Sequence, residues 1–162
     1  MTATAAAPTK ADPISVTADT KKGEIYGTAD INATPERIFR ALTTEEMADW
    51  WGQGPYKTTD YKIDLRPGGK WSCKAINPKG DESTIGGEYI TIDPPRVLEY
   101  TWVPSWDNYQ ESRVRFEIAP TAMGSRVTLK HTGFAGREEM CNNHTTGWKQ
   151  VLGWLSGYVS SK

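Results

Sequence analysis

Apolar side chains recur every three or four residues along the last segment of the chain, residues 136–162. Residues at this spacing share one face of a helix. That face carries His144, Trp148, Val151, Leu152, Leu155 and Val159. Gly147, Gly153 and Gly157 each cost about 1 kcal/mol relative to alanine inside a helix, so packing has to hold this segment helical. The pattern predicts a long C-terminal helix with one covered face.

From Tyr56 to about residue 130 the period changes to two, which is the period of β-strands. Turn signals divide this stretch at residues 66–69, 77–81, 93–95 and 121–124. The pattern predicts six strands, and the short connections favour antiparallel neighbours. The apolar side of these strands holds Trp71, Cys73, Ala75, Leu98, Tyr100, Trp102, Val114, Phe116, Ile118, Val127, Leu129 and His131. The polar side holds Arg113, Arg115, Glu117, Arg126, Thr128 and Lys130.

The N-terminal part predicts one more strand and two short helices. Gly23–Ile31 alternates weakly and is predicted to be the first strand. Thr34, followed by a proline and a glutamate, has the pattern of an N-cap, and Thr43 and Glu46 have the spacing of a capping box for a second helix that ends at Gly52. Residues 1–20 have no apolar periodicity and are predicted to be a disordered tail before a single domain, residues 21–162.

These elements predict an α+β fold in which a curved antiparallel sheet of about seven strands wraps a long C-terminal helix, with two short helices between strands 1 and 2. One apolar and one solvated face are typical of an antiparallel sheet that covers a single partner. The chain has 162 residues, of which 37% are hydrophobic and seven are tryptophan, enough for a substantial core.

Charge and segment composition exclude several classes of partner. With 19 basic and 20 acidic side chains, the net charge of -1 provides no field for nucleic acid or an anionic membrane. No apolar run approaches the ~20 residues of a membrane span, and the N-terminus does not resemble a signal peptide. We therefore expect a soluble, cytoplasmic protein. Cys73 and Cys141 form neither a CxxC pair nor a disulfide framework.

Four motifs carry a resemblance to a known family. They are RPGGKW (66–71), GGEYITIDPPRVLEYTW (86–102), SRVTLKHTGF (125–134) and HTTGWKQVL (144–152). In this order they resemble the activator of Hsp90 ATPase homologue 1-like (AHSA1-like) domain family, within the START/Bet v 1-like (SRPBCC) superfamily. The resemblance implies a helix-grip fold with a pocket. Eukaryotic activators of Hsp90 carry a further N-terminal domain with an NxNNWHW motif, which this sequence lacks, so we expect no Hsp90 partner.

His131 and His144 are the only histidines, and both fall on predicted apolar faces. Imidazole suits proton transfer near neutral pH, which makes them weak candidates for a catalytic role. A core histidine satisfied by hydrogen bonds explains the same pattern, and we favour it. Two histidines without further ligands do not predict a metal site, and no cofactor is expected.

Large aromatic side chains concentrate on the inward faces, where they suit either a cavity wall or a filled core. If a cavity exists, the predicted ligand-binding residues are Trp50, Trp71, Tyr100, Trp102, Phe116, His131, His144 and Trp148. The leading hypothesis is a module that binds a small hydrophobic or aromatic molecule. One alternative, implied by the wider superfamily, is an enzyme of polyketide cyclase or aromatase type that uses a pocket histidine. Another is a chaperone-associated or stress-related interaction protein. The sequence leaves open whether the protein forms a homodimer.

Overall fold

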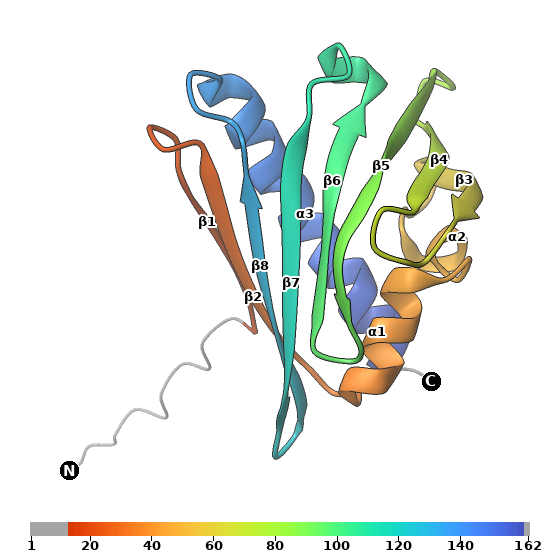
Figure 1. Ribbon diagram of the computed structural model, residues 1–162, viewed down its shortest axis with the longest axis vertical. Helices are drawn as coiled ribbons and strands as arrows, with labels where there is room; N and C mark the ends of the chain where they lie inside the picture. The colour runs from red at the N-terminus through yellow and green to blue at the C-terminus, as the bar shows by residue number, and fades with distance from the viewer. Residues whose placement is uncertain (1–12, 161–162) are drawn as a thin grey trace.

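Eight antiparallel strands form one curved sheet in the order β1-β2-β8-β7-β6-β5-β4-β3 (Figure 1). The computed structural model describes residues 13–160. The strands are β1 (Ile14–Asp19), β2 (Glu24–Ile31), β3 (Lys57–Ile63), β4 (Lys70–Ile76), β5 (Glu82–Asp93), β6 (Val97–Pro104), β7 (Ser112–Thr121) and β8 (Gly124–Thr132). The helices are α1 (Pro35–Thr43), α2 (Met47–Trp50), the 3-10 helix η1 (Ser105–Asp107) and α3 (Glu138–Ser160).

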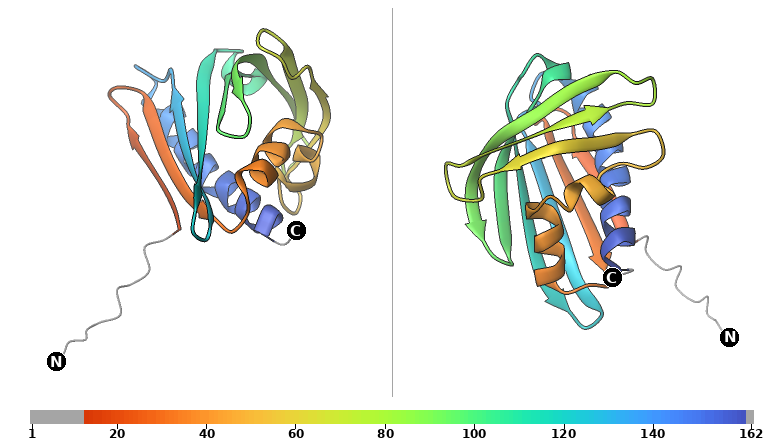
Figure 2. Two further views of the ribbon diagram at one scale, coloured as in Figure 1. Left: turned by 60° about the horizontal axis from the view of Figure 1, so that its bottom comes forward. Right: turned by 90° about the vertical axis from the view of Figure 1, so that its right-hand side faces the viewer.

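The sheet curls, and α1, α2 and α3 lie on its open side (Figure 2). The face of α3 predicted from the sequence is the one turned to the sheet: Leu152 and Leu155 are fully buried, and Trp148 is 3% exposed. The helix-grip arrangement of an α+β fold is thereby confirmed. No helix among residues 13–160 has both the length and the hydropathy of a membrane span.

The prediction of about seven strands holds for β2 to β8, and β1 is an eighth that the sequence reasoning missed. Residues 14–19 were predicted to belong to a disordered tail, and this is wrong, because they pair with β2 from Ile14↔Ala29 to Asp19↔Glu24. Ile14 and Val16 alternate with polar residues and pack against the core. Backbone pairing and this partial burial together offset the cost of ordering the segment. Residues 1–12 of the predicted tail lie outside the described residues.

The short helices lie between β2 and β3, and their caps differ from each other. Thr34 caps α1 as predicted, because its hydroxyl accepts a hydrogen bond from the Arg37 amide at 3.1 Å. The capping box predicted for α2 is not formed. The Thr43 hydroxyl instead donates to the Phe39 carbonyl at 2.7 Å, and the Glu46 carboxylate accepts from the Arg37 guanidinium at 2.8 Å. The Glu46 side chain thus forms a partly buried ion pair with Arg37 instead of a local cap.

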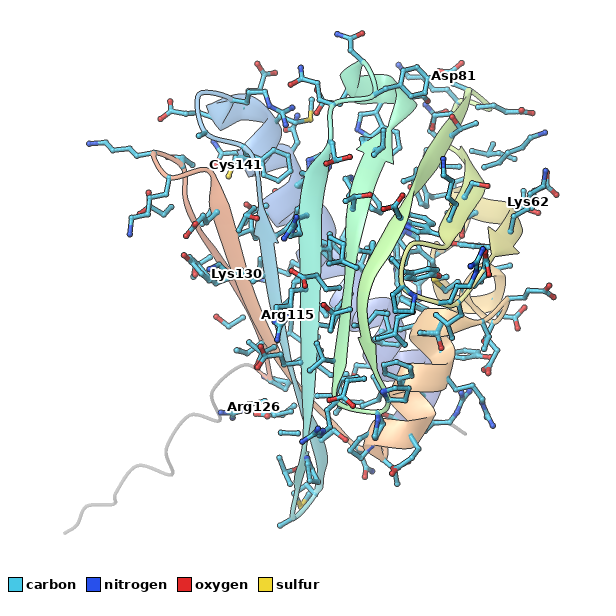
Figure 3. All side chains as sticks on the ribbon, viewed as in Figure 1. Lys62, Asp81, Arg115, Arg126, Lys130 and Cys141 are labelled. Atoms are coloured by element: carbon cyan, nitrogen blue, oxygen red, sulfur yellow. The ribbon has the colours of Figure 1, made fainter. Side chains whose placement is uncertain are left out.

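The two faces of the sheet separate as the alternation predicts. Every residue assigned to the apolar side is at most 7% exposed, and His131 is completely buried. Arg115, Arg126 and Lys130 extend from the other face, away from α3 (Figure 3). Arg126 pairs with Asp30 across the strands β2 and β8 at 2.8 Å. Ion pairs of this exposed kind contribute little to stability, so the buried face holds the fold together.

Gly87 of β5 lies directly against the backbone of β6. A Cβ atom at Gly87 would lie 1.8 Å from the carbonyl oxygen of Thr101, so only glycine fits there. The register then shifts at a bulge between Tyr89 and Thr91. Bulges bend a strand and redirect its side chains. Here Tyr89 faces Tyr100 across the two strands, beside the interior space.

Candidate functional site

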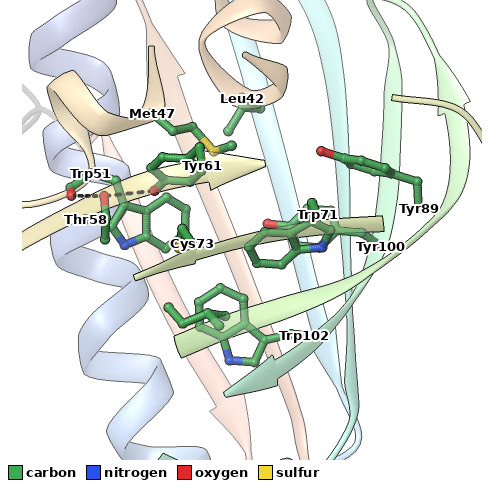
Figure 4. Close-up of a pocket in the computed structure, with 11 residues that line it drawn as sticks. Leu42, Met47, Trp51, Thr58, Tyr61, Trp71, Cys73, Tyr89, Tyr100 and Trp102 are labelled. Carbon is green, nitrogen blue, oxygen red and sulfur yellow. Dashed lines mark hydrogen bonds between the residues drawn. The ribbon is translucent and has the colours of Figure 1, made fainter. Parts of the chain in front are cut away.

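Two neighbouring cavities lie between the sheet and the helices. The inner cavity has a volume of about 20 Å³ and is the more enclosed of the two, and Figure 4 shows the residues around it. It is lined by Leu42, Met47, Trp51, Thr58, Tyr61, Trp71, Cys73, Ile85, Tyr89, Tyr100 and Trp102. The outer pocket has about 200 Å³ and is more open. It is lined by Trp51, Tyr56, Trp102, Trp106, Met140, Asn143, His144, Gly147, Trp148 and Val151.

The indoles of Trp51 and Trp102 border both cavities and divide them. Their rings are stacked, with centroids 5.9 Å apart and planes inclined by 24°. The ring of Trp148 meets Trp51 edge to face at 5.7 Å. Such offset and edge-to-face contacts are the favoured arrangements of aromatic pairs. The outer pocket is therefore a recess with aromatic walls, and Trp51 and Trp102 separate it from the inner cavity.

His131 is held by two hydrogen bonds that specify its protonation. The indole Nε1 of Trp148 donates to His131 Nδ1 at 2.8 Å, so this ring nitrogen carries no proton. His131 Nε2 therefore carries it and donates to the Ser112 hydroxyl at 2.7 Å, and Ser112 in turn donates to the Trp102 carbonyl. Burial holds the pKa of His131 well below its ordinary value, helped by His144 and Arg137 nearby. His131 is a neutral, fully bonded core residue.

His144 is bonded in a similar way at the border of the outer pocket. The indole Nε1 of Trp102 donates to His144 Nε2 at 3.1 Å, so His144 Nδ1 carries the proton and donates to the Met140 carbonyl at 3.0 Å. Burial lowers the pKa of His144, partly opposed by the Met140 carbonyl and the Asp107 carboxylate. Both ring nitrogens are thus engaged in the neutral form. Each histidine anchors one tryptophan ring of the pocket wall.

The inner cavity contains polar groups among its rings. The Tyr61 hydroxyl donates to the Thr58 hydroxyl at 2.8 Å, which donates to the Trp51 carbonyl at 2.8 Å, as the dashed lines in Figure 4 mark. Burial raises the pKa of the Cys73 thiol to about 11, so the thiol is neutral and a poor nucleophile. Burial also raises the pKa of Tyr89 to about 12. Cys73 and Tyr89 therefore keep their protons near neutral pH and can act as hydrogen-bond donors, but not as nucleophiles.

The predicted site residues are distributed unevenly over this arrangement. Trp71, Tyr100 and Trp102 line the inner cavity; Trp102, His144 and Trp148 line the outer pocket. Trp50, Phe116 and His131 line neither of the two. The Trp50 indole donates to the Ala41 carbonyl at 3.0 Å, and Phe116 packs edge to face behind Trp148 at 5.8 Å. Within residues 13–160, no group of three or more His, Cys, Asp and Glu side chains gathers to hold a metal ion.

Several lining residues were absent from the predicted set. Trp51 follows directly on the predicted site residue Trp50, and Tyr61 and Tyr89 could have been found from the alternation in β3 and β5. Trp106 lies in η1, at the end of β6. No periodicity marks so short a segment, so sequence reasoning had no signal for it.

The chain is similar to one known protein family and to several solved structures. The model of the family described as Activator of Hsp90 ATPase homolog 1-like protein matches residues 32–160. The AHSA1 protein of Silicibacter pomeroyi is 25% identical with a TM-score of 0.72, over 85% of this chain and 98% of that one. A protein of Rhodobacter sphaeroides is 17% identical with a TM-score of 0.81, over 93% and 100%. The AHSA1-like protein of Aeromonas hydrophila is 19% identical with a TM-score of 0.72, over 85% and 92%. The sequence has no significant match among curated proteins.

Proposed function

Because the chain belongs to the Activator of Hsp90 ATPase homolog 1-like family, we propose that it binds a small apolar or aromatic molecule in the outer pocket between α3 and β6. The observation that carries this proposal is the composition of the pocket wall. Five of its ten lining residues are aromatic rings of Trp or Tyr, and none is Asp, Glu, Lys or Arg. Pockets for small molecules are mostly apolar, with a few polar groups that orient the ligand.

Two rings of the pocket wall are held in place by hydrogen bonds, which favours binding. The indoles of Trp102 and Trp148 are each held by a hydrogen bond to a histidine, so they lose little conformational freedom when a ligand arrives. A volume of about 200 Å³ suits a molecule of one or two rings better than a long lipid chain. Asn143 and His144 provide polar edges at the wall. The ligand class that follows is small, mostly apolar and uncharged.

The two alternatives receive less support. A histidine that acts as acid or base needs a ring nitrogen available to the substrate. Both nitrogens of His131 and of His144 are engaged in hydrogen bonds. An interaction protein needs a contiguous exposed apolar patch. The large hydrophobic side chains exposed among residues 13–160 come from four segments, and only Trp106 and Tyr109 share one; the others are Tyr26, Leu65 and Met123.

Two glycines of α3 provide a matched test. A Cβ atom at Gly147 or at Gly157 would meet no heavy atom within 4 Å, so both positions accept a side chain. Gly147 lines the outer pocket, whereas Gly157 is exposed elsewhere on the helix. Gly147→Leu should fill the pocket, and Gly157→Leu should give the same gain in helix propensity without filling it.

Indane and 1-indanone are suitable ligands, followed by isothermal titration calorimetry and by melting temperature. Binding to the folded state raises the melting temperature by mass action. We expect both compounds to bind the wild type and Gly157→Leu, and to lose binding to Gly147→Leu. The proposal fails if neither compound binds the wild type, or if Gly147→Leu binds them as the wild type does.

A further inference from the structure

Two phenol hydroxyls in the inner cavity have no hydrogen-bond partner within residues 13–160. They belong to Tyr89 on β5 and Tyr100 on β6, whose rings meet edge to face with centroids 6.3 Å apart. The two residues are only 3% and 7% exposed. The third phenol of the cavity, Tyr61, differs because its hydroxyl donates to Thr58. Figure 4 shows the three tyrosines around the same space.

A ligand that covered these hydroxyls without accepting a hydrogen bond from them would lose about 1–3 kcal/mol for each. The inner cavity of about 20 Å³ has room for one water-sized atom beside them. Burial raises the pKa of Tyr89 to about 12 and that of Tyr100 further, so both phenols keep their protons and are donors. Tyr89 and Tyr100 both line the inner cavity, so each can donate to an acceptor placed there.

Trp51 separates these donors from the outer pocket, and its indole is the least restrained of the buried tryptophans. The indole N–H groups of the other four, Trp50, Trp71, Trp102 and Trp148, donate to Ala41, Thr101, His144 and His131. The Trp51 indole N–H donates to no group within residues 13–160, although the ring is 8% exposed. Only packing against neighbouring rings holds it.

The backbone of Trp51 is held by a hydrogen bond, whereas its indole is not. Its carbonyl accepts a hydrogen bond from the Thr58 hydroxyl at 2.8 Å, which fixes the main chain. Trp51 follows the four-residue helix α2 and precedes Gly52, which has a φ of 130°. The side chain can therefore change rotamer without breaking a hydrogen bond of its own. Because Trp51 lines both spaces, a rotation of its ring would join the inner cavity to the outer pocket.

We propose that the two cavities form one ligand site, in which a ligand displaces the Trp51 indole and places an acceptor oxygen against the hydroxyls of Tyr89 and Tyr100. This inference rests on the proposed function and narrows its ligand class. The ligand is an aromatic or alicyclic molecule with a neutral acceptor such as a carbonyl group. A carboxylate is disfavoured because no cation lines the inner cavity and a buried unpaired charge is expensive.

The test compares indane with 1-indanone, which share one ring frame and differ by a single oxygen, on the wild type and on Tyr100→Phe. The substitution removes one hydroxyl and leaves the ring. We expect Tyr100→Phe to raise the dissociation constant of 1-indanone about tenfold, the equivalent of 1.4 kcal/mol, and to leave the dissociation constant of indane unchanged. Tyr26→Phe, which removes a hydroxyl on the outer face of β2, serves as the control and should change neither value.

Movement of Trp51 is read from the indole N–H signals in ¹H–¹⁵N NMR spectra, with its signal assigned from Trp51→Phe. On addition of 1-indanone the Trp51 signal should shift more than that of Trp50, whose N–H is bonded to Ala41. If both compounds bind but Tyr100→Phe weakens neither, or if the Trp51 signal stays in place, the inference is overturned and the proposed function stands. If neither compound binds the wild type, both are overturned.

Discussion

The indole Nε1 of Trp148 and the Nδ1 of His131 are joined by a hydrogen bond of 2.8 Å that links α3 to β8. An indole nitrogen can only donate, so it can never face a protonated His131 Nδ1. The bond therefore keeps His131 neutral and sets the orientation of a pocket ring at the same time. Protonation of His131 has to break this link between helix and sheet.

Acid should destabilise the protein partly through His131. Its pKa is lowered in the folded state, whereas the unfolded chain titrates near pH 6.5. Below about pH 6.5 the His131 side chain binds a proton in the unfolded state but not in the folded state. The free energy of unfolding therefore decreases as the pH is lowered, until the pKa of the folded state is reached. His131→Gln should lower stability at neutral pH but flatten this dependence, by up to about 1.4 kcal/mol per pH unit. Urea denaturation of the wild type and of His131→Gln at about pH 7, 6 and 5 measures this dependence. If the free energy of unfolding changed equally with pH in both proteins, the role of His131 would be contradicted.

His144 should matter for binding through the ring that it anchors. His144→Gln can still accept a hydrogen bond from the Trp102 indole, whereas His144→Leu cannot. We expect His144→Gln to weaken the binding of 1-indanone less than His144→Leu does. The two binding free energies should differ by on the order of 0.5–1.5 kcal/mol, the contribution of one hydrogen bond. Calorimetric titration of the two variants decides. Equal losses in both would show that the bond to Trp102 does not contribute.

Strand β1 should contribute measurably to stability, contrary to the expectation of a disordered segment. Val16 is half-buried and packs against the core, and Thr17 on the opposite face is exposed. Val16→Ser should therefore cost about 1 kcal/mol of the free energy of unfolding, and Thr17→Ser less than about 0.5 kcal/mol. Chemical denaturation compares them. If both variants were as stable as the wild type, β1 would not be an integral strand.

Gly87 should tolerate no side chain. A Cβ atom there would lie 1.8 Å from the Thr101 carbonyl oxygen and 2.7 Å from the Trp71 indole nitrogen, and the backbone oxygen cannot move aside cheaply. We expect Gly87→Ala to destabilise the protein by at least about 1–3 kcal/mol. Gly157→Ala, in open space on α3, should instead stabilise it by up to about 1 kcal/mol. Thermal denaturation that ranks the two variants in the opposite order would contradict this account.

Periodicity along the sequence was sufficient to predict most of the fold. Alternation over β4, β6, β7 and β8 and the three- and four-residue spacing in α3 assign side chains to a face, because strand and helix geometry fix which residues share one. Burial confirms that assignment from Trp71 to Val159. The same alternation is present in Ile14, Val16 and Ala18. A run of six residues is too short to predict a strand until its pairing partner, β2, is known.

The candidate site depended on contacts that only the folded chain creates. Thr43 and Glu46 have capping-box spacing, yet Glu46 bonds to Arg37 and to Tyr158, which is far away in sequence. The charge of His131 likewise depends on an indole from another element. Sequence predicted an aromatic interior but not whether it was filled, because the volume left among large rings is set by how they stack. The stacking of Trp51 on Trp102 is the contact that divides that interior into two cavities.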